Sequence, residues 1–520
     1  MSASLTMNSG KKRAPVLIAN RGEIAIRIAR TCRALGFPTV AVYSDADRLA
    51  EHVKACDQAF YLGGPAPKDS YLNVERVLAA AKASGARYVH PGYGFLSERP
   101  HFADACVEEG LIFVGPSADS MRLMGDKISA RATVDEIGVP RVPGSAAAVT
   151  DAEEAQRISA KIGYPVLFKA AAGGGGKGMR RVDSAAEAQS AFDSAGREAL
   201  SSFGDGAIYV EKYILEPHHV EIQVFGDGKG NAIHLGEREC SIQRRHQKVW
   251  EETPAPILDR HPATREKMFE AAVRIAKHVK YAGAGTIEFI VDGNGNFYFL
   301  EMNTRLQVEH PVTEWVTGVD LVAWQLLLAA GELPLPSIPA RTGSAIEVRL
   351  YAEDPQHFLP APGPLGEIEF PNGPFVRTDT SFTGPGEVSV HYDPMIAKVS
   401  VWAPSRAAAV DRLRVALDEV RVQPPKKTDG TRIGSLRTNL SFLRKLARHP
   451  VVIGGDTTTD VVSKNPDLTE RTQRALPLSA AIALSLNQLI FESGETAQAQ
   501  VPSTSASGWS LLARREGVRS

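Results

Sequence analysis

The chain has 520 residues, 43% of them hydrophobic and 23% charged, which suits about three or four domains with buried cores. Its 59 Lys and Arg against 60 Asp and Glu leave a formal net charge of −1, so bulk electrostatics favour neither nucleic acid nor an anionic membrane as a partner. The four cysteines show no CxxC spacing, so we expect no zinc cluster, no disulfide framework and a reducing compartment.

After a flexible arm at residues 1–14, residues 15–125 predict a parallel α/β domain. PVLIAN and PTVAVYS are short apolar runs typical of buried strands, and IAIRIARTCRAL between them has apolar residues at helical spacing. This alternation, continued by VERVLAAAKAS and RYVHP, indicates a parallel sheet. The turn at residues 20–23 has one glycine where a dinucleotide-binding fold places three, so we expect no Rossmann cofactor site there.

A second region begins at Asp126. Its strands YPVLFKA and IYVEKYI flank a glycine-rich loop. Two hairpins follow, HVEIQVFGDGKGNAIHLGERE and AGTIEFIVDGNGNFYFLEMN, each alternating around a Gly/Asn/Asp turn. The change from parallel units to antiparallel hairpins indicates an α+β region.

The C-terminal third is expected to be β-rich, from IEVRLYAED to HYDPMIAKVSVWA, and to continue as a helix over RAAAVDRLRVALDEV. The Pro, Gly and polar residues of 422–435 predict a loop or linker. Residues 451–520 predict a partly disordered tail with one helix at 477–492. The apolar stretch at 476–491 is interrupted by polar residues and too short for a membrane helix, and the N-terminal arm lacks the apolar segment of a signal peptide. We therefore expect a cytoplasmic protein.

The glycine-rich loop is the first candidate site. It follows Lys169, at the end of a predicted strand, and continues as Gly173, Gly174, Gly175, Gly176, Lys177, Gly178 and Met179. Since Lys177 is followed by glycine and not Ser or Thr, the loop is not a P-loop. Its backbone N–H groups can bind phosphate oxygens while Lys169 supplies a positive charge. A flexible hairpin turn is the alternative.

A pair of carboxylates is the second candidate. In a hairpin with an even-length loop, Glu288 and Glu301 point to the same face, directly opposite or diagonal, about 5–8 Å apart. Two hard oxygen ligands with Asn303 nearby suit Mg²⁺ held jointly with nucleotide phosphates. The alternative is a solvated sheet face with the two charges splayed apart.

Two charged segments complete the candidates. Arg305, Gln307 and Glu309 lie within five residues and could hold a small oxyanion against a base, although charged loop residues are often only solvated. The run ERECSIQRRHQK at 237–248 could contact RNA but lacks interleaved aromatics, and it suits a phosphate or bicarbonate clamp better. Cys240 within it is expected to be a small packed residue, not a nucleophile.

Together these segments closely resemble the biotin carboxylase family, a branch of the ATP-grasp enzymes. The matching segments are IANRGEIAIRI, HPGYGFLSE, LMGDKISAR, FKAAAGGGGKGM, EKYILEPHHVEIQV, ERECSIQRRHQK, EFI followed by FYFLEMNTRLQVEHPVTE, and EVRLYAEDP, over about residues 15–420. The resemblance implies an ATP-grasp fold with a Rossmann-like parallel α/β domain in front, an ATP-grasp domain at 126–335 with a mobile lid at about 142–214, and a β-rich C-terminal domain at 336–450.

The resemblance implies a ligase that uses ATP to convert bicarbonate into carboxyphosphate and then carboxylates biotin. By motif match the nucleotide and Mg²⁺ (or Mn²⁺) residues are Lys127, Lys169 and Gly173–Gly178 with Met179 at the phosphates, Glu211, Lys212 and Ile214 at the adenine, His219, Gln243, His246 and Asn303 along the nucleotide, and Glu288 and Glu301 at the metal. By the same match the residues that hold bicarbonate are Lys248, Arg305, Gln307 and Val308, with Glu309 as the base. The residues at biotin are Arg349, at its oxygen, and Tyr93, near its ring.

The chain departs from the family pattern in three places. Ala172 stands where some members carry a further glycine, and residues 422–435 are longer and more polar than the usual turn. No Met-Lys-Met sequence occurs and Met395 is the last methionine, so we expect the biotin to be borne by a separate carrier protein.

The expected role is therefore the first half-reaction of an acyl-CoA carboxylase, acetyl-CoA or propionyl-CoA, as in fatty acid biosynthesis. The expected partners are the carrier and carboxyltransferase subunits, with a homodimer also possible. A carbamoyl-phosphate synthetase is the alternative enzyme, but its large subunit carries two tandem grasp units. A non-catalytic paralogue is expected to lack Glu309, Arg349 or the carboxylate pair, and all are present.

Overall fold

The computed structural model describes residues 13–470, apart from 146, 171–178, 204–205, 246, 429, 432 and 435, and only the backbone of 127, 128, 202 and 203. The chain divides into two compact units, Met1–Glu470 and Arg471–Ser520. All described residues belong to the first unit. The glycine loop and the helix predicted at 477–492 lie outside them.

The N-terminal part is a parallel α/β layer, as predicted. Its strands follow the order β3-β2-β1-β4-β5: β1 (Val16–Ile18), β2 (Thr39–Ser44), β3 (Gln58–Gly63), β4 (Tyr88–His90) and β5 (Ile112–Phe113). The connecting helices are α1 (Gly22–Ala34), α2 (Glu51–Lys54), α3 (Val74–Ala83), α4 (Pro100–Glu108) and α5 (Ala118–Gly125). Ile24, Ile28 and Cys32 recur at helical spacing on α1 and are buried in one cluster with the residues of β1.

A small antiparallel sheet follows, in the region expected to be the lid. In spatial order its strands are β7 (Met179–Val182), β6 (Val166–Ala170) and β8 (Ile208–Lys212). Two helices, α6 (Lys127–Glu136) and α7 (Ala152–Ile162), precede β6 in the chain, and α8 (Ala185–Phe203) connects β7 to β8. Phe168, Val182 and Ile208 belong to a hydrophobic cluster formed only by residues of this region. The region therefore has a core of its own.

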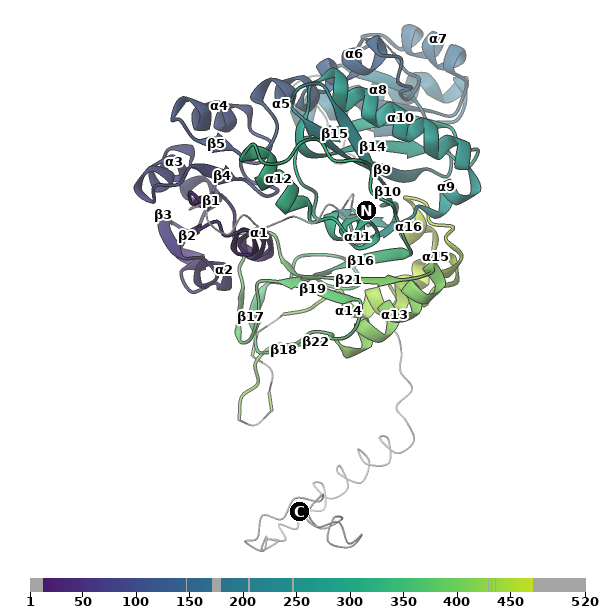
Figure 1. Ribbon diagram of the computed structural model, residues 1–520. Helices are drawn as coiled ribbons and strands as arrows, with labels where there is room; N and C mark the ends of the chain where they lie inside the picture. The colour runs from purple at the N-terminus through teal and green to yellow at the C-terminus, as the bar shows by residue number, and fades with distance from the viewer. Residues whose placement is uncertain are drawn as a thin grey trace, which may run out of the picture. The chain divides into compact units, whose positions relative to one another are not determined.

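An eight-stranded antiparallel sheet forms the centre of the molecule (Figure 1). In spatial order its strands are β15 (Phe297–Asn303), β14 (Ala282–Val291), β9 (His218–Asp227), β10 (Ala232–Glu239), β13 (Trp250–Thr253), β16 (Ser344–Tyr351), β21 (Met395–Ala403) and β19 (Val376–Thr380). The pairs β9–β10 and β14–β15 are the two predicted hairpins. Pairing of β13 with β16 carries the sheet across the expected domain boundary at residue 335.

Strand alternation separates the two faces of this sheet. One face carries apolar residues and is covered by α10 (Pro262–His278), α13 (Arg406–Glu419) and α14 (Leu440–Leu446). The registers place Glu288, Glu221, Arg238, Glu251 and Glu347 together on the other face, against which α11 (His310–Thr317) packs. The sheet therefore gathers charged side chains from five strands on one buried surface.

Short elements complete the chain. They are α9 (Pro256–Arg260), α12 (Leu321–Ala329), α15 (Pro450–Gly454), α16 (Val461–Lys464), three 3-10 turns at Asp45–Asp47, Pro67–Asp69 and Pro466–Leu468, and the strand pairs β11 (Gln243–Arg244) with β12 (Gln247–Lys248), β17 (Gly363–Leu365) with β20 (Gly386–Val388), and β18 (Glu367–Glu369) with β22 (Arg421–Gln423).

The prediction of a loop over all of residues 422–435 is wrong at its start. Val422 and Gln423 belong to β22, where Val422 pairs with Ile368 and packs, partly buried, against the hydrophobic core. Pairing stops at Pro424, because proline has no N–H to donate to a ladder.

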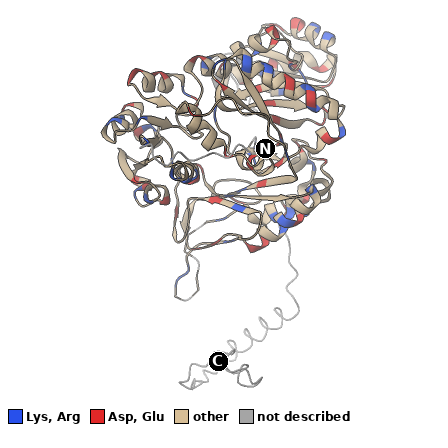
Figure 2. Ribbon diagram, viewed as in Figure 1, with Lys and Arg blue, Asp and Glu red and all other residues tan. Residues whose placement is uncertain are grey.

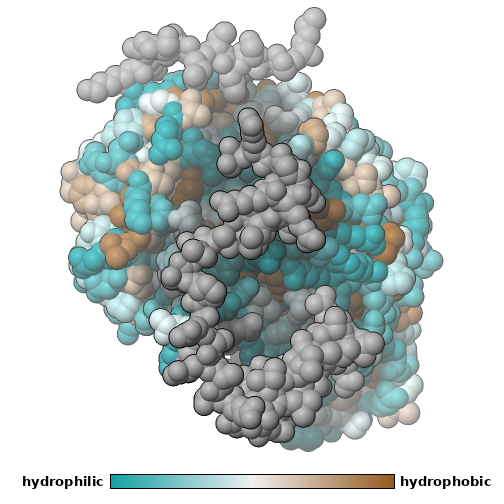
Figure 3. Space-filling view, turned by 90° about the horizontal axis from the view of Figure 1, so that it is seen from below, coloured by the Kyte–Doolittle hydropathy of each residue, from teal (hydrophilic) through white to brown (hydrophobic). Residues whose placement is uncertain are grey.

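The surface carries both charges and scattered apolar residues. Figure 2 shows Lys and Arg interspersed with Asp and Glu on the outer helices, and Figure 3 shows hydrophobic residues in small groups among hydrophilic ones. Isolated exposed apolar residues are ordinary on globular proteins. In the part of the chain that the structure describes, none of the helices combines the length and apolar character of a membrane span.

A substitution at Trp250, on β13, tests the packing where β13 pairs with β16 in the central sheet. Its side chain is only 1% exposed and belongs to the cluster under α13. We expect Trp250→Ala to lower the free energy of unfolding by about 3–5 kcal/mol, because it leaves a large cavity in the core. Denaturant unfolding measures the loss, and Leu49→Ala, at a side chain 80% exposed, is the control. Equal stability of the two variants would contradict the assignment of Trp250 to the core.

Candidate active site

A partly buried lysine surrounded by carboxylates is the centre of the charged sheet face. The Lys248 ammonium donates to three carboxylates, at 2.6 Å to Glu221 Oε2, 2.8 Å to Glu288 Oε1 and 2.8 Å to Glu309 Oε1. Two of these carboxylates come from neighbouring strands, β9 and β14, and the third immediately precedes α11. The lysine is therefore the common partner of the metal-site and bicarbonate-site predictions.

A second cation shares one of those carboxylates. Arg349 on β16 donates from Nη2 to Glu309 Oε2 at 3.0 Å and from Nε to Glu251 Oε1 at 2.6 Å. Glu309 is thus held between Lys248 and Arg349, and its side chain is fully buried. The structure brings the predicted base and the predicted biotin-side arginine into direct contact.

The predicted metal pair has the expected geometry. Glu288 and Glu301 are directly opposite each other in the β14–β15 register and share one face. The even-length loop behind that expectation is wrong: Val291 pairs with Phe297 at the turn, and a β-bulge between Glu288 and Phe289 brings the two glutamates opposite each other. Glu288 is buried and accepts from Asn303 Nδ2 at 2.8 Å and from Gln307 Nε2 at 3.1 Å. His219 Nε2 lies 3.1 Å from Glu288 Oε2, and Gln243 Nε2 lies 3.2 Å from His219 Nδ1.

The segment 305–309 is anchored at both ends. Arg305 donates from Nη2 to Asn303 Oδ1 at 3.0 Å and from Nε to Glu98 Oε2 at 2.9 Å. The carbonyl of Val308 accepts from the buried Lys398 ammonium at 2.8 Å. These contacts keep the predicted bicarbonate residues against the charged sheet face.

The nucleotide residues in the lid region are only partly described. Lys169 on β6 donates to Glu211 Oε2 at 2.9 Å, and Arg131 forms an ion pair with the same carboxylate. Lys212 Nζ donates to the carbonyl oxygens of residues 163 and 164 at 2.8 and 3.1 Å. Ile214 follows β8, and Met179 begins β7. The Lys127 side chain, Gly173–Gly178 and His246 lie outside the described residues.

Tyr93 is tied to the same surface from the N-terminal domain. Its hydroxyl donates to Glu23, which also forms an ion pair with Lys398 at 3.2 Å. Since Lys398 binds the Val308 carbonyl as well, the predicted biotin residue and the predicted bicarbonate segment share one buried lysine.

The sequence interpretation missed three charged residues of this surface. Glu221 and Glu251 bind the predicted lysine and arginine, and Arg238 forms a buried ion pair with Glu221. Glu221 stands in the quoted segment EKYILEPHHVEIQV, where a carboxylate on an apolar strand was a usable signal. Cys240 is fully buried, and burial raises the pKa of its thiol, which agrees with a packed residue.

The charges of the cluster shift one another's protonation. Burial alone raises the pKa of Glu309, but the positive charges of Lys248 and Arg349 outweigh burial and hold it below its ordinary value. The pKa of Glu288 is likewise lowered, against burial, by Lys248 and His219. Burial lowers the pKa of Lys248, but its carboxylate partners raise it well above its ordinary value. These groups are therefore ionised together at neutral pH.

The residues present fit a divalent cation. Glu288 and Glu301 supply two carboxylates on one face, and one ligand atom from each of His219, Glu221 and Glu288 lies within 4.8 Å of the others. Oxygen ligands are those that Mg²⁺ and Mn²⁺ prefer.

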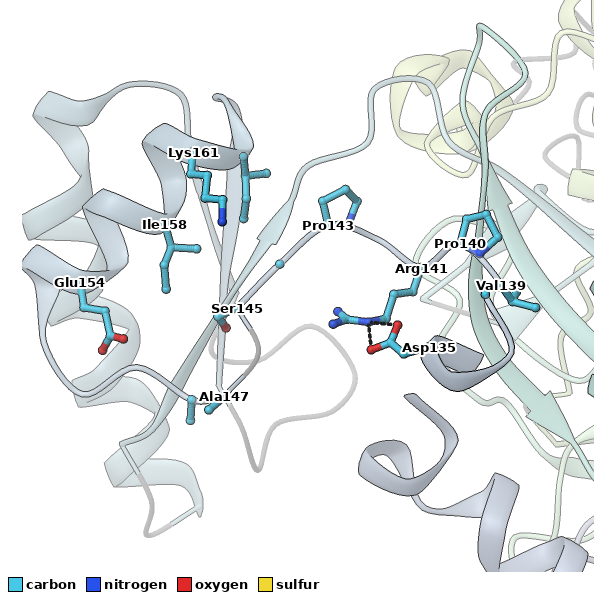
Figure 4. A pocket seen from close by; sticks show the side chains of 14 residues that line it. Asp135, Val139, Pro140, Arg141, Pro143, Ser145, Ala147, Glu154, Ile158 and Lys161 are labelled. Carbon is cyan, nitrogen blue, oxygen red and sulfur yellow. Dashed lines mark hydrogen bonds and ion pairs between the residues drawn. The ribbon is translucent and has the colours of Figure 1, made fainter. Parts of the chain in front are cut away.

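A separate cavity of about 960 Å³ lies beside α7 (Figure 4). Ile158 and Lys161 of α7 face the segment that carries Pro140 and Pro143, and Arg141 on that segment forms an ion pair with Asp135 at 2.7 Å. This cavity contains none of the charged residues around Lys248. This cavity is therefore separate from the candidate active site around Lys248.

Comparison with known proteins gives three consecutive family matches. Residues 12–121 match "Biotin carboxylase, N-terminal domain", residues 126–337 match "Carbamoyl-phosphate synthase L chain, ATP binding domain", and residues 347–464 match "Biotin carboxylase C-terminal domain". The chain is 48% identical over 453 residues to a biotin carboxylase of Halalkalibacterium halodurans, covering 86% of this chain and 97% of the relative. It is 51% identical over 473 residues to the propionyl-CoA carboxylase alpha chain of Ruegeria pomeroyi, covering 86% of this chain and 67% of that longer relative.

A solved structure shows the same architecture. It is the biotin carboxylase domain dimer of the 2-oxoglutarate carboxylase of Hydrogenobacter thermophilus, in complex with MgADP, ADP and bicarbonate. It matches with a TM-score of 0.79 at 43% identity, covering 89% of this chain and 100% of the other.

The fold and these matches define an ATP-grasp enzyme of the ligase class, and they confirm the predicted combination of a parallel N-terminal domain with antiparallel sheets. The chain belongs to the biotin carboxylase family.

Lys248 tests the electrostatic account of the cluster. We expect Lys248→Met to lower the stability by about 3–5 kcal/mol at pH 8, because buried carboxylates lose their common cation. Carboxylates with lowered pKa values, such as Glu288 and Glu309, stabilise the fold above their unfolded pKa, and that contribution disappears as the pH falls. The deficit should therefore shrink as the pH falls below about 5.

Thermal unfolding of wild type and variant across this pH range measures the effect. Lys54→Met is the matched control, since that exposed lysine pairs with Glu51 on the surface and should change the stability by less than about 1 kcal/mol. A Lys248→Met deficit that is small or independent of pH would contradict the account.

Proposed function

We propose that the protein catalyses the ATP-dependent carboxylation of biotin borne on a separate carrier protein, with bicarbonate as the carbon source and carboxyphosphate as the intermediate. The observation that carries this proposal is the placement of Glu309 between Lys248 and Arg349 beside Glu288. That arrangement unites, on one buried surface, a base with cations suited to both an incoming anion and a developing oxyanion.

The nucleotide side of the proposal uses residues from the lid region and the hairpins. We assign the ATP phosphates to Lys127, Lys169 and the loop Gly173–Gly178, and the adenine to Glu211, Lys212 and Ile214. His219, Gln243, His246 and Asn303 are assigned to the remainder of the nucleotide. Mg²⁺ held by Glu288, Glu301 and Asn303 supplies positive charge to the phosphate oxygens of ATP.

The bicarbonate step follows from the charges of the cluster. Bicarbonate is an anion, and Lys248 and Arg305, with the amide of Gln307 and the backbone of Val308, provide donors for it. Glu309 is assigned as the base that takes its proton, because the two cations keep this carboxylate ionised at neutral pH. The bicarbonate oxygen then attacks the γ-phosphate of ATP, giving carboxyphosphate and ADP.

The biotin step is assigned to Arg349 and Tyr93. Carboxyphosphate breaks down to CO₂ and phosphate, the phosphate removes the N1 proton of biotin, and N1 attacks CO₂. The Arg349 guanidinium is always charged and suits the enolate-like oxygen that forms on the biotin ring. Tyr93 is assigned to the side of the ring, held by its bond to Glu23.

The partners follow from the carrier requirement. We propose that a biotin carboxyl carrier protein and a carboxyltransferase complete an acetyl-CoA or propionyl-CoA carboxylase in the cytoplasm, the former in fatty acid biosynthesis. The similarity to a propionyl-CoA carboxylase alpha chain supports an acyl-CoA acceptor. The dimer named for the 2-oxoglutarate carboxylase domain supports a homodimer here.

Glu301 tests the reaction and the metal assignment together. We expect the wild-type chain to hydrolyse ATP only with bicarbonate and faster with free biotin, and Glu301→Ala to reduce that rate by at least about 100-fold, because a ligand at the phosphates is lost. Glu216→Ala is the control, since this exposed glutamate belongs to none of the assigned contacts. Equal activity of the two variants would exclude Glu301 as a metal ligand.

The acyl-CoA acceptor requires the whole enzyme. We expect the chain to co-purify from its native source with a biotinylated carrier and a carboxyltransferase. Assays of that complex with acetyl-, propionyl- and methylcrotonyl-CoA should give the highest kcat/KM with acetyl- or propionyl-CoA. A preference for methylcrotonyl-CoA would overturn this part of the proposal.

A further inference from the structure

Glu347 on β16 is a buried carboxylate that the proposed reaction does not use. Its residue is 0% exposed, and neither carboxylate oxygen has a hydrogen-bond partner among the described residues. It lies two residues before Arg349, so the two side chains share one face of the strand. Every other buried carboxylate around Lys248 has a cationic partner at hydrogen-bond distance.

The direct partner of Glu347 on β21 is the uncharged Ser400, and charged groups lie around the two residues on the same sheet face and on α11, which packs against it. They are Glu251 on β13, Arg349 on β16, Lys398 on β21, Asp379 and Arg377 on β19, and Glu309, His310 and Glu314 at and along α11. The neighbours on the opposite face, from α13 and α14, are apolar.

The nearby cations are already engaged with other groups. Arg349 binds Glu251 and Glu309, and Lys398 binds Glu23 and the carbonyl of residue 308. An ionised carboxylate without hydrogen bonds is costly to bury, whereas the protonated form carries no charge. Glu251 is the directly opposite residue in the β13–β16 register, and two like charges at that spacing destabilise a sheet.

The pKa shifts of Glu347 and Glu251 agree with a neutral Glu347. Burial raises the pKa of Glu347 well above its ordinary value, with Lys398 opposing and Glu251 adding to the shift. Burial also raises the pKa of Glu251 to about 7, although Arg349 opposes it. Two interacting carboxyls of this kind lose their protons in two separate steps, and the first proton leaves the carboxyl whose anion is better stabilised, here Glu251 beside Arg349.

We propose that Glu347 is a positioning residue of the biotin carboxylase reaction: it carries a proton at neutral pH, so it does not compete with Glu251 and Glu309 for the guanidinium of Arg349. The inference rests on the proposed function for the role of Arg349. The protonated state of Glu347 itself does not depend on that function.

The proton has a consequence for Arg349. Loss of the proton places a further negative charge two residues from the guanidinium on the same strand face, where it competes with Glu251 and Glu309 for that cation. The reaction should therefore slow at alkaline pH. Glu347→Gln keeps the size and neutrality of the protonated side chain and removes its titration.

The first experiment measures thermal unfolding of the full-length chain between pH 5 and pH 9. A carboxyl with a raised folded pKa costs stability progressively as the pH rises from its unfolded pKa, near 4.3, to its folded pKa. We expect Glu347→Gln to unfold at a higher temperature than wild type, by a margin that widens with pH. Glu347→Asp keeps a titrating carboxyl and should retain the pH dependence of wild type.

Glu314→Gln is the matched control. Glu314 is also buried, but it pairs with Arg27 and Arg377, and these cations lower its pKa against the effect of burial. It should unfold below wild type by a margin that is constant over the same pH range. A constant deficit of this kind in Glu347→Gln would show an ionised Glu347 and overturn the proposal.

The second experiment measures kcat for biotin-dependent ATP cleavage against pH. We expect Glu347→Gln to keep kcat within about twofold of wild type at pH 7 and to move the alkaline decline upward by about one pH unit or more. An unchanged alkaline limb would overturn the positioning role. If wild type shows no biotin-dependent activity, the proposed function fails, while the unfolding experiment still decides the protonation of Glu347.

Discussion

The ammonium of Lys248, shared by three buried carboxylates, is the interaction on which the rest of the site depends. Two ionised carboxylates in a protein interior repel each other strongly unless a cation lies between them. Lys248 supplies that cation to Glu221, Glu288 and Glu309 at once. Removal of its charge takes a cationic partner from residues of two strands and of a helix start at once, so the metal-side and bicarbonate-side residues form one electrostatic unit.

The eight-stranded sheet makes this unit possible. Its registers place charged residues of β14, β9, β10, β13 and β16 on one face, while apolar residues of the same strands meet α10 and α13 on the other. Strand alternation alone produces that separation. The pairing of β13 with β16 joins residues about 100 positions apart in sequence, and it brings Arg349 to Glu251.

Local pattern was sufficient for some of the site and insufficient for the rest. Glu288 and Glu301 belong to one hairpin, and their shared face was predicted correctly, but from an even-length loop that the structure does not have. A β-bulge between Glu288 and Phe289, which alternation alone does not specify, brings the two glutamates opposite each other. Glu221 and Glu251 acquire their roles through pairing with distant strands, which no local period specifies. The local pattern supplied Glu309 and the run that contains Lys248, and the family resemblance added Arg349 and a role for each, whereas the contacts among them required the three-dimensional arrangement. The strand at Val422 was missed because its partner, Ile368, is likewise distant.

The same surface holds glutamates in opposite protonation states. Glu309 has two cationic partners, so its pKa lies below the ordinary value, whereas Glu347 has no hydrogen-bond partner among the residues that the structure describes and its pKa lies above the ordinary value. A carboxyl that acts as a base, such as Glu309, must be ionised to accept a proton. A neutral Glu347 does not compete with Glu309 for the cation Arg349. The surroundings of each glutamate on this sheet, and not its residue type, therefore determine its protonation state and so its role. Arg349 connects the two states, because it touches Glu309 directly and shares its strand face with Glu347.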